Sequence, residues 1–376
     1  MSSAARRIIR IADDFRLQRG GTLAEVNLAY ETWGRRNEHD NNSVLLFTGL
    51  SPSAHAASSP EDPEPGWWEW MIGPGRPLDT DRYHVICVNS LGSCFGSTGP
   101  ASIDPATGRP YGCDFPELSI EDIARAAHEL VKLLGIGRLH TVMGASLGGM
   151  AALAYALEFP HAAERLVSLC AAMRAEPAAV ALRSLQREII CADPAWHNGR
   201  YEPGAGPLEG MRLARKLGMI SYRSAQEWAQ RFERDETAAG ELDAPFAAGL
   251  QVEAYLEANA RRFVERFDPN CYLYLSRAMD WFDAGDLAGI AIQRALVIGV
   301  ETDKLFPVHQ QRELADRLCE LGRDVEFVAM PSLQGHDAFL VDRGRFAPVL
   351  RKFFSDDLIC VDDERISIRD CVAAAG

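Results

Sequence analysis

The stretch Thr141-Val-Met-Gly-Ala-Ser-Leu-Gly-Gly-Met150 decides the fold of this chain. The apolar run 139–143 predicts a buried strand and residues 147–159 predict a helix, so Ser146 falls on the turn between them. A sharp strand-to-helix turn needs small neighbours, and the glycines at 144 and 148 remove the Cβ atoms that would clash there. The turn presents the Ser146 hydroxyl at the head of a helix, where free N–H groups favour an oxyanion.

The G-x-S-x-G pattern is short, and glycines after a strand also serve helix packing alone, so the partners of Ser146 must decide its role. A nucleophilic serine requires a base, and the base requires an acid to orient it. After a nucleophile elbow, the acid and then the histidine follow in the chain, each at the carboxyl end of a late strand. Asp303 follows the apolar run 295–300, and His336 follows the run 325–330. We expect Ser146, Asp303 and His336 to form a catalytic triad.

Other residues compete for two of these roles. Glu301 is a rival acid, but Asp303 is favoured because the loop must travel some way beyond the strand end to reach the histidine. His55, His84 and His140 are weaker rivals for the base, since none of them follows a late strand.

Two backbone N–H groups are expected to form the oxyanion hole. One belongs to Leu147, directly after the nucleophile. The other comes from the loop after the strand expected at 43–48, where Leu50 is the predicted donor.

Apolar and amphipathic runs alternate along the chain on both sides of Ser146. Strands are expected at 21–33, 43–48, 83–88, 139–143, 163–171, 294–300 and 325–330, and helices at 123–134, 147–159 and 309–321. The first strand reads as antiparallel, and Ser119 with Asp122 reads as a capping box that begins the first helix. This order predicts an α/β fold with a doubly wound, mostly parallel sheet.

The strand rhythm stops between residues 173 and 290, which predicts an inserted helical cap. Helices are expected there at 177–190, 210–217, 224–232 and 252–267, with no clear strand. The core is then built from residues 1–172 and 291–376, and the tail after Phe354 carries no pattern.

Composition excludes several classes of function. The net charge of −14 over 376 residues, with both signs interspersed and no basic stripe, argues against nucleic-acid binding. No apolar run is long enough to span a bilayer and no signal peptide is recognisable, so we expect a cytoplasmic protein without membrane contact. The nine cysteines include no C-x-x-C pair, which favours reduced thiols over a disulfide frame or a zinc site. No metal or cofactor is expected, because the triad supplies the chemistry.

Several blocks of the sequence resemble, in the correct order, the homoserine O-acyltransferase family of α/β-hydrolase-fold enzymes. They are Asp79-Thr-Asp-Arg-Tyr83, Asn89-Ser-Leu-Gly-Ser-Cys-Phe-Gly-Ser-Thr-Gly-Pro100, Asp114-Phe-Pro116, the elbow Gly-Ala-Ser-Leu-Gly-Gly-Met, Leu213-Ala-Arg-Lys-Leu-Gly-Met-Ile-Ser-Tyr222 and Gly335-His-Asp337. This resemblance spans nearly the whole chain. It implies an α/β-hydrolase fold with a cap, and ping-pong acyl transfer from an acyl-CoA through an acyl-enzyme on Ser146 to the hydroxyl of an amino acid.

The same resemblance implies that Arg215 holds the carboxylate of the acceptor and that Asp337 holds its ammonium group. Both roles suit a zwitterion, since a guanidinium binds a carboxylate bidentately and a carboxylate pairs with an ammonium. The alternatives are an exposed charge on a cap helix for Arg215 and a helix N-cap beside His336 for Asp337.

One loop departs from the acetyl-transferring homoserine enzymes, which read H-A-L-T-G-D-S-H after the first parallel strand. This chain reads Thr48-Gly-Leu-Ser-Pro-Ser-Ala-His55 there. Its last four residues resemble the branch that acylates L-serine with succinyl-CoA. Pro52, Ser53, Ala54 and His55 are therefore expected to set acceptor specificity.

A succinyl group brings a second carboxylate that needs a cation, and Arg187 on the first cap helix is the candidate for acyl-CoA specificity. An arginine at that position is also common in family members that use acetyl-CoA. Succinyl-using homoserine enzymes tend to carry arginine two residues after the acid, where this chain has Leu305.

The resemblance thus implies a serine O-succinyltransferase that supplies activated serine for cysteine synthesis, with acyl-CoA and an amino acid as substrates. The rivals are a homoserine O-acetyl- or O-succinyltransferase in methionine synthesis, an esterase or thioesterase, and a catalytically inactive binding module. By family analogy, a homodimer is expected through the helical cap.

Overall fold

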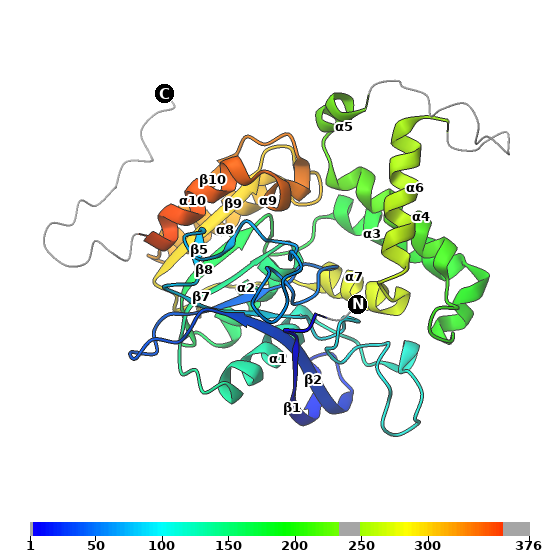
Figure 1. Cartoon of the computed structure of the whole chain (residues 1–376), viewed down its shortest axis with the longest axis horizontal. Coiled ribbons are helices and arrows are strands. Elements are labelled where there is room, and N and C mark those ends of the chain that lie inside the picture. The colour runs from blue at the N-terminus through cyan, green and yellow to red at the C-terminus, as the bar shows by residue number, and fades with distance from the viewer. Residues whose placement is uncertain (1–2, 233–248, 356–376) are drawn as a thin grey trace, which may run out of the picture.

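A computed structural model describes residues 3–232 and 249–355 of the chain. One sheet of eight strands, in the order β1-β2-β6-β3-β7-β8-β9-β10, forms its centre (Figure 1). The strands are β1 Arg7–Arg16, β2 Thr22–Trp33, β3 Ser43–Phe47, β6 His84–Val88, β7 Leu139–Ala145, β8 Ala163–Leu169, β9 Arg294–Val300 and β10 Asp324–Met330, and a separate small pair is β4 Ile72–Gly73 with β5 Leu78–Asp79. The predicted doubly wound, mostly parallel sheet is confirmed.

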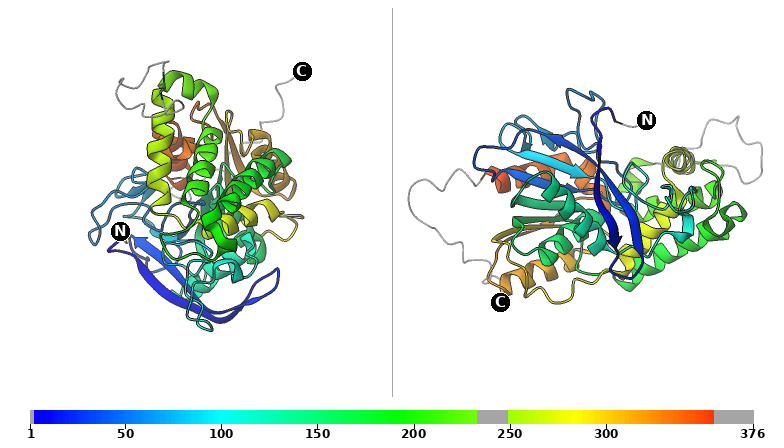
Figure 2. Two further views of the ribbon diagram at one scale, coloured as in Figure 1. Left: turned by 90° about the vertical axis from the view of Figure 1, so that its right-hand side faces the viewer. Right: turned by 90° about the horizontal axis from the view of Figure 1, so that it is seen from below.

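The six strands from β6 to β10 in this order run parallel, whereas β1 and β2 are antiparallel to their neighbours. The predicted antiparallel strand corresponds to β2, which joins β6 to the edge strand β1. Figure 2 shows β1 and β2 as a long blue ribbon beside the parallel strands. β1 escapes prediction because most of its side chains are exposed and it carries little apolar pattern.

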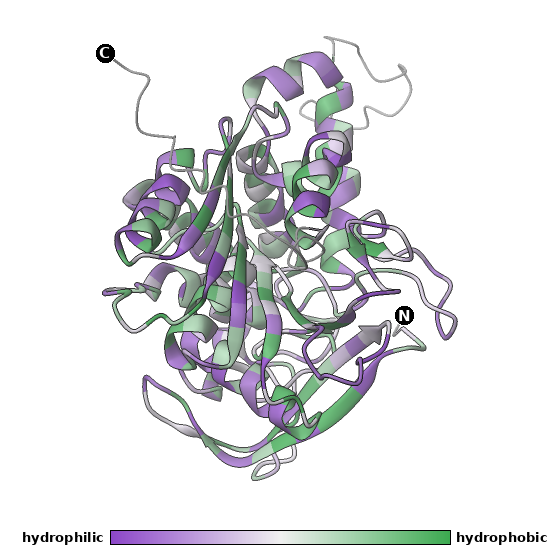
Figure 3. Cartoon of the chain, turned by 90° about the vertical axis from the view of Figure 1, so that its left-hand side faces the viewer, coloured by the Kyte–Doolittle hydropathy of each residue, from purple (hydrophilic) through white to green (hydrophobic). Residues whose placement is uncertain are grey.

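Alternate residues of each parallel strand face two different hydrophobic cores, as the period of a β-strand requires. On β3, Leu45 and Phe47 face one core, and Val44 and Leu46 face the other. The first core includes side chains of helices α1 (Ile120–Leu133), α2 (Leu147–Glu158) and α8 (Val308–Glu320), and the second includes those of α10 (Arg343–Ser355). In Figure 3 hydrophobic green gathers on the central strands, which lie between these helix layers.

The predicted capping box begins α1. The Ser119 hydroxyl accepts a hydrogen bond from Asp122 N at 3.1 Å, and the Asp122 carboxylate accepts one from Ser119 N at 3.1 Å. Both residues are buried, so these two N–H groups are satisfied without water.

Five helices lie between β8 and β9 in the chain and beside the sheet in space (Figures 1 and 2). They are α3 Pro177–Ala192, α4 Leu208–Tyr222, α5 Ala225–Arg231, α6 Gln251–Val264 and α7 Pro269–Trp281. α4 is longer than predicted at both ends, and α7 was not predicted. The shorter helical pieces are η1 Gly112–Asp114, η2 Pro194–Gly199, η3 Gly335–Asp337 and α9 Ala338–Val341. No helix in the described ranges combines the length and apolar character needed to cross a membrane.

The turn from β7 into α2 is packed so closely that only glycine fits at positions 144 and 148, two residues on either side of Ser146. A Cβ on Gly144 would lie 2.2 Å from the carbonyl carbon of Gly148. One on Gly148 would lie 2.5 Å from Phe47 O and 2.8 Å from Thr48 O. These neighbours are backbone atoms that cannot rotate away. The two glycines therefore bring α2 directly against the end of β3.

Gly148→Ala should destabilise the protein by about 2 kcal/mol, because overpacking against backbone outweighs the gain of about 1 kcal/mol that alanine brings to a helix. Urea unfolding would measure the difference in the free energy of unfolding. Gly137→Ala is the matched control, since a Cβ there meets nothing within 4 Å and the residue is exposed. Equal stability of the two variants would contradict this account of the turn.

Candidate active site

Ser146 lies between the end of β7 and the start of α2 with φ 56° and ψ −125°. A positive φ is strained for a residue with a Cβ, and such strain persists only where the surroundings impose it. Here the Ser146 N–H donates to Leu169 O at 2.9 Å, which fixes the turn to β8. The strained turn holds the serine side chain at the carboxyl edge of the sheet.

Asp303 and His336 reach Ser146 from the loops that follow β9 and β10 at the same edge. His336 Nε2 lies 2.9 Å from Ser146 Oγ, and His336 Nδ1 lies 2.7 Å from Asp303 Oδ2. Asp303 Oδ1 accepts hydrogen bonds from the N–H groups of Leu305 at 2.8 Å and Phe306 at 3.0 Å. The three residues that the sequence predicts as a triad are thus joined in one buried chain of hydrogen bonds.

A second set of contacts ties the loop of the acid to the loop of the histidine. Thr302 Oγ1 donates to Ser332 O at 2.7 Å and accepts from Gly335 N at 3.1 Å. Gly335 has φ 62°, and a Cβ there would lie 2.4 Å from Tyr222 O at the end of α4. A glycine is required before His336 because the inserted helices approach the backbone so closely at this point.

The charge on Asp303 sets the proton affinity of His336. Burial alone lowers the pKa of His336, but the attraction of Asp303 and its hydrogen bond outweigh burial and raise the pKa above its ordinary value. Asp337 adds to this effect and Arg183 opposes it. Because Nδ1 faces a carboxylate, neutral His336 carries its proton there and leaves Nε2 free to accept the serine proton.

The rival residues lie elsewhere. Glu301 is exposed in the loop before Asp303. His84 Nδ1 lies 3.2 Å from Ser43 Oγ and His140 Nδ1 lies 2.8 Å from Thr141 Oγ1, so both form local contacts within the sheet.

A cavity of about 180 Å³ opens above Ser146, between the core and the inserted helices. Of the residues predicted for the site, Leu50, Pro52, Ser146, Arg215, His336 and Asp337 line it. Ser53, Ala54, His55, Arg187, Leu147 and Asp303 are not among the lining residues. Leu147 is the first residue of α2, so its N–H has no acceptor within the helix.

The two predicted zwitterion anchors line the cavity from different elements, Arg215 from α4 and Asp337 from the end of η3. The Arg215 guanidinium lies 4.3 Å above the ring of Phe263, and its buried Nε has no hydrogen-bond partner among the described residues. Asp337 Oδ2 accepts a hydrogen bond from Arg223 Nε at 3.0 Å. Asp337 stands at the start of α9, but its side chain forms no capping hydrogen bond. The N-cap alternative for Asp337 is therefore not observed.

Arg187 points away from the cavity into a buried ion cluster on α3 and α7. Its Nη2 lies 2.6 Å from Asp280 Oδ2 and its Nη1 donates to Ser276 Oγ at 2.9 Å. Arg183, one helical turn earlier, lines the cavity and also donates from Nε to Asp280 at 2.5 Å. The buried Arg183 Nη2 has no hydrogen-bond partner in the described part of the chain. The guanidinium that reaches the cavity is thus Arg183 and not Arg187.

Sequence reasoning did not assign Arg183 to the site, nor the aromatic residues of the cavity wall, which are Phe47, Trp67, Tyr222, Tyr272, Phe306 and Phe339. The Arg-x-x-x-Arg spacing on α3 signals two arginines on one helix face, but which of them faces the cavity depends on how α3 packs on α7. Aromatic residues in loops and helices carry no such signal, because most of them serve packing alone.

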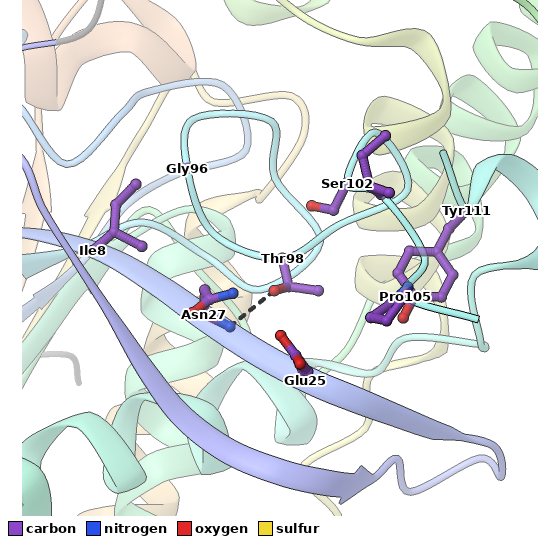
Figure 4. Close-up of a pocket in the computed structure, with 9 residues that line it drawn as sticks. Ile8, Glu25, Asn27, Gly96, Thr98, Ser102, Pro105 and Tyr111 are labelled. Carbon is purple, nitrogen blue, oxygen red and sulfur yellow. Dashed lines mark hydrogen bonds between the residues drawn. The ribbon is translucent and has the colours of Figure 1, made fainter. Parts of the chain in front are cut away.

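A second hollow of about 270 Å³ lies between β2 and the loop that carries Gly96 to Tyr111 (Figure 4). Asn27 N donates to Thr98 Oγ1 at 2.9 Å in its wall, and Glu25 there is paired with Arg10. Its lining includes none of the residues around Ser146.

Comparison with known proteins agrees with this geometry. Residues 42–342 match the family of the alpha/beta hydrolase fold. The chain belongs to this family. The enzyme is 56% identical to a serine O-succinyltransferase of Litchfieldella anticariensis, over 93% of this chain and 98% of that one. It is 54% identical to an L-serine/homoserine O-acetyltransferase of Streptomyces lavendulae, over 93% of this chain and 97% of that one.

Among solved structures, the homoserine O-acetyltransferase of Bacillus anthracis matches with a TM-score of 0.85 and 28% identity, over 94% of this chain and 98% of that one. The predicted resemblance to the serine and homoserine O-acyltransferases is therefore confirmed, and the enzyme is a transferase of that group.

Asp303→Asn should lower the rate of Ser146 acylation by about 10⁴-fold, the loss found when a triad acid is replaced by its amide. Activity requires neutral His336, so it falls as the pH drops through the His336 pKa. Without the Asp303 charge that pKa falls, and the acid limb of the pH–rate profile should move to lower pH. Release of p-nitrophenol from a p-nitrophenyl ester measures both effects. Glu301→Gln is the matched control; an equal loss in that variant would reject Asp303 as the acid.

Proposed function

We propose that the enzyme is a serine O-succinyltransferase, which transfers the succinyl group of succinyl-CoA to the hydroxyl of L-serine. The observation that carries this proposal is the cavity that holds a Ser146–His336–Asp303 chain together with an arginine and an aspartate, Arg215 and Asp337. A simple hydrolase has no need for such a pair of opposite charges around its serine.

In the first half-reaction, Ser146 Oγ attacks the thioester carbonyl while its proton passes to His336 Nε2, 2.9 Å away. The oxyanion that forms is stabilised by the N–H groups of Leu147 and Leu50. The carbon–sulfur bond then breaks, CoA leaves as a thiol with the proton from His336, and Ser146 carries the succinyl ester.

In the second half-reaction, the hydroxyl of L-serine gives its proton to His336 and attacks the ester on Ser146. The same oxyanion hole serves again, and the bond to Ser146 Oγ breaks as His336 returns the proton to it. O-succinyl-L-serine leaves, and the free enzyme is restored. Because CoA departs before the acceptor reacts, the kinetics are ping-pong.

Arg215 and Asp337 orient the acceptor. Arg215 has an unpartnered buried Nε and offers the planar donor set that a carboxylate binds. Asp337 uses one oxygen for Arg223, which leaves capacity for the acceptor ammonium group. A serine bound between these two charges would present its hydroxyl toward Ser146.

The succinyl carboxylate requires a further cation, and Arg183 is the residue that supplies it. Arg183 and Arg187 share the single carboxylate of Asp280, so this buried cluster carries a net positive charge. A buried unbalanced charge is costly, and an anion entering the cavity beside Arg183 would neutralise it. In this proposal Arg187, the residue predicted from the sequence, acts behind Arg183 by holding Asp280.

The second candidate is acyl transfer to L-homoserine or from acetyl-CoA, which the name of the Streptomyces lavendulae relative favours. It uses the same triad and the same anchors. Serine and homoserine differ by one methylene, which a pocket distinguishes by only about 1–3 kcal/mol.

We also propose that O-succinyl-L-serine serves cysteine synthesis in the cytoplasm, since its succinate is a leaving group that a sulfur nucleophile can displace. The chemistry requires acyl-CoA as a co-substrate and no resident cofactor. A homodimer through the inserted helices is proposed as well, supported by the exposed Leu213 and Ile220 on α4.

Purified enzyme is supplied with acetyl-CoA or succinyl-CoA, each combined with L-serine or L-homoserine. Of the four combinations, succinyl-CoA with L-serine should react best and give O-succinyl-L-serine. Mass spectrometry of the products and CoA release would measure this. O-acylhomoserine as the main product would support the second candidate, and CoA release that does not depend on an acceptor would reject acyl transfer.

Arg215→Ala should abolish transfer while slow CoA release continues. Arg212→Ala is its control, because Arg212 pairs with Glu209 and Glu257 away from the cavity.

Arg183→Met should lower kcat/KM for succinyl-CoA by about 10²-fold, the size expected when a charge-assisted hydrogen bond is lost, and should affect acetyl-CoA much less. Steady-state kinetics with both donors would give the ratio. Arg187→Met, on the same helix face, is the comparison. A loss specific to succinyl-CoA in Arg187→Met alone would return the role to Arg187.

A further inference from the structure

The loop predicted to set acceptor specificity enters the cavity with only part of its length. Residues 49–52 line the cavity, and the chain then turns away from it. Three hydrogen bonds hold this turn: Trp67 Nε1 donates to Ser53 O at 2.9 Å, Asn89 Nδ2 donates to Pro52 O at 3.3 Å, and Trp67 N donates to His55 O at 3.3 Å. Pro52 can therefore touch a substrate directly, whereas His55 acts from behind the wall.

His55 is anchored through both of its ring nitrogens. Nδ1 lies 2.9 Å from Glu31 Oε2 on β2, and Nε2 lies 2.8 Å from the carbonyl oxygen of Glu64. A carbonyl oxygen only accepts, so Nε2 carries a hydrogen. A second hydrogen on Nδ1 then gives a cationic imidazole that donates to a carboxylate and to a carbonyl at once.

The surroundings favour this cationic form. The Glu31 side chain is 1% exposed, and its Oε1 has no hydrogen-bond partner among the described residues. Removing His55 would therefore leave a buried carboxylate without that donor, which is costly. The charged groups that act on His55 are Glu31 from β2 and Asp62 from the following loop, and both are acidic. Burial lowers the pKa of His55, but these partners outweigh burial and raise it above its ordinary value.

We propose that the Glu31–His55 ion pair positions the loop that selects the acceptor, so that Glu31, a strand residue outside the cavity, is a determinant of acceptor specificity. This inference rests on the proposed acyl transfer to an amino-acid hydroxyl. The pair holds the end of the loop against β2 and thereby fixes how far Pro52 and Leu50 project toward Ser146. His55 does not line the cavity, so its role is to hold the residues that do.

The pair makes acceptor choice depend on pH. Neutral His55 has one hydrogen for two acceptors, so the contact to Glu31 or the contact to Glu64 is lost when the proton leaves. The folded-state pKa is raised, so the pair is intact at low pH and is lost as the pH rises through that pKa. A released loop would discriminate less well between serine and homoserine.

The test is the ratio of kcat/KM for L-serine to kcat/KM for L-homoserine, measured from about pH 6 to about pH 9, the range in which histidines titrate. Both acceptors react with the same acyl-enzyme, so the titration of His336 cancels in the ratio. In the unsubstituted enzyme the ratio should change toward unity about fivefold as the pH rises, which corresponds to the loss of one hydrogen bond.

Glu31→Gln should hold the ratio at its low-pH value throughout, because neutral His55 then keeps both of its contacts. The Gln amide can donate to His55 Nδ1, so the hydrogen bond is kept and only the charge is removed. Glu176→Gln is the matched control, because Glu176 forms a similar contact with His309, at 2.5 Å, on an exposed surface. That variant should follow the unsubstituted enzyme. A purely structural role of Glu31 would lower the melting temperature and leave the ratio and its pH dependence unchanged.

A ratio that does not vary with pH in the unsubstituted enzyme overturns the positioning role, and so does a Glu31→Gln profile that matches it. Should Glu31→Gln fail to fold, the profile of the unsubstituted enzyme decides alone. Enzyme that transfers an acyl group to neither acceptor rejects the proposed function and this inference together. Transfer with a constant ratio rejects the inference only.

Discussion

Parallel pairing of neighbouring strands is the constraint on which the site depends. β3, β7, β8, β9 and β10 lie side by side in parallel register, so the loops after them meet at one edge of the sheet. Ser146 follows β7, Asp303 follows β9 and His336 follows β10. Ser146 and His336, which are 190 positions apart in sequence, thereby come within hydrogen-bond distance.

Several charged side chains around that edge have partners that do not balance them fully. Arg183 and Arg187 share the carboxylate of Asp280. Asp337 forms an ion pair with Arg223. The Arg215 guanidinium packs against the rings of Tyr222 and Phe263. Such an arrangement is costly when empty and becomes favourable when a ligand supplies the missing charges. Under the proposed function, a zwitterionic acceptor and a dicarboxylic acyl group would supply those charges, whereas a neutral ester would not. Arg183, Arg187 and Arg215 all lie on helices that are inserted between β8 and β9.

Local patterns were sufficient to predict most of the core. The elbow glycines, the apolar runs and the capping box at Ser119 are properties of short segments, and the order of strands then determined where Asp303 and His336 had to lie. Prediction failed where a side chain's direction depends on tertiary packing. Arg183 and Arg187 are equivalent in sequence, and only the packing of α3 on α7 directs Arg183 into the cavity. The ion pair between Glu31 and His55 joins a strand to a distant loop, and a contact of this kind produces no periodic pattern in the sequence from which it could be predicted.

The most direct test is to mix the enzyme with succinyl-CoA in the absence of an acceptor and to measure the mass of the intact protein by mass spectrometry. We expect a mass increase of one succinyl group, located on Ser146 by peptide mapping. It should disappear when L-serine is added, with O-succinyl-L-serine appearing in equal amount. Ser146→Ala should show no increase. Product formation without a covalent intermediate, or an adduct on any other residue that L-serine discharges, would contradict the account.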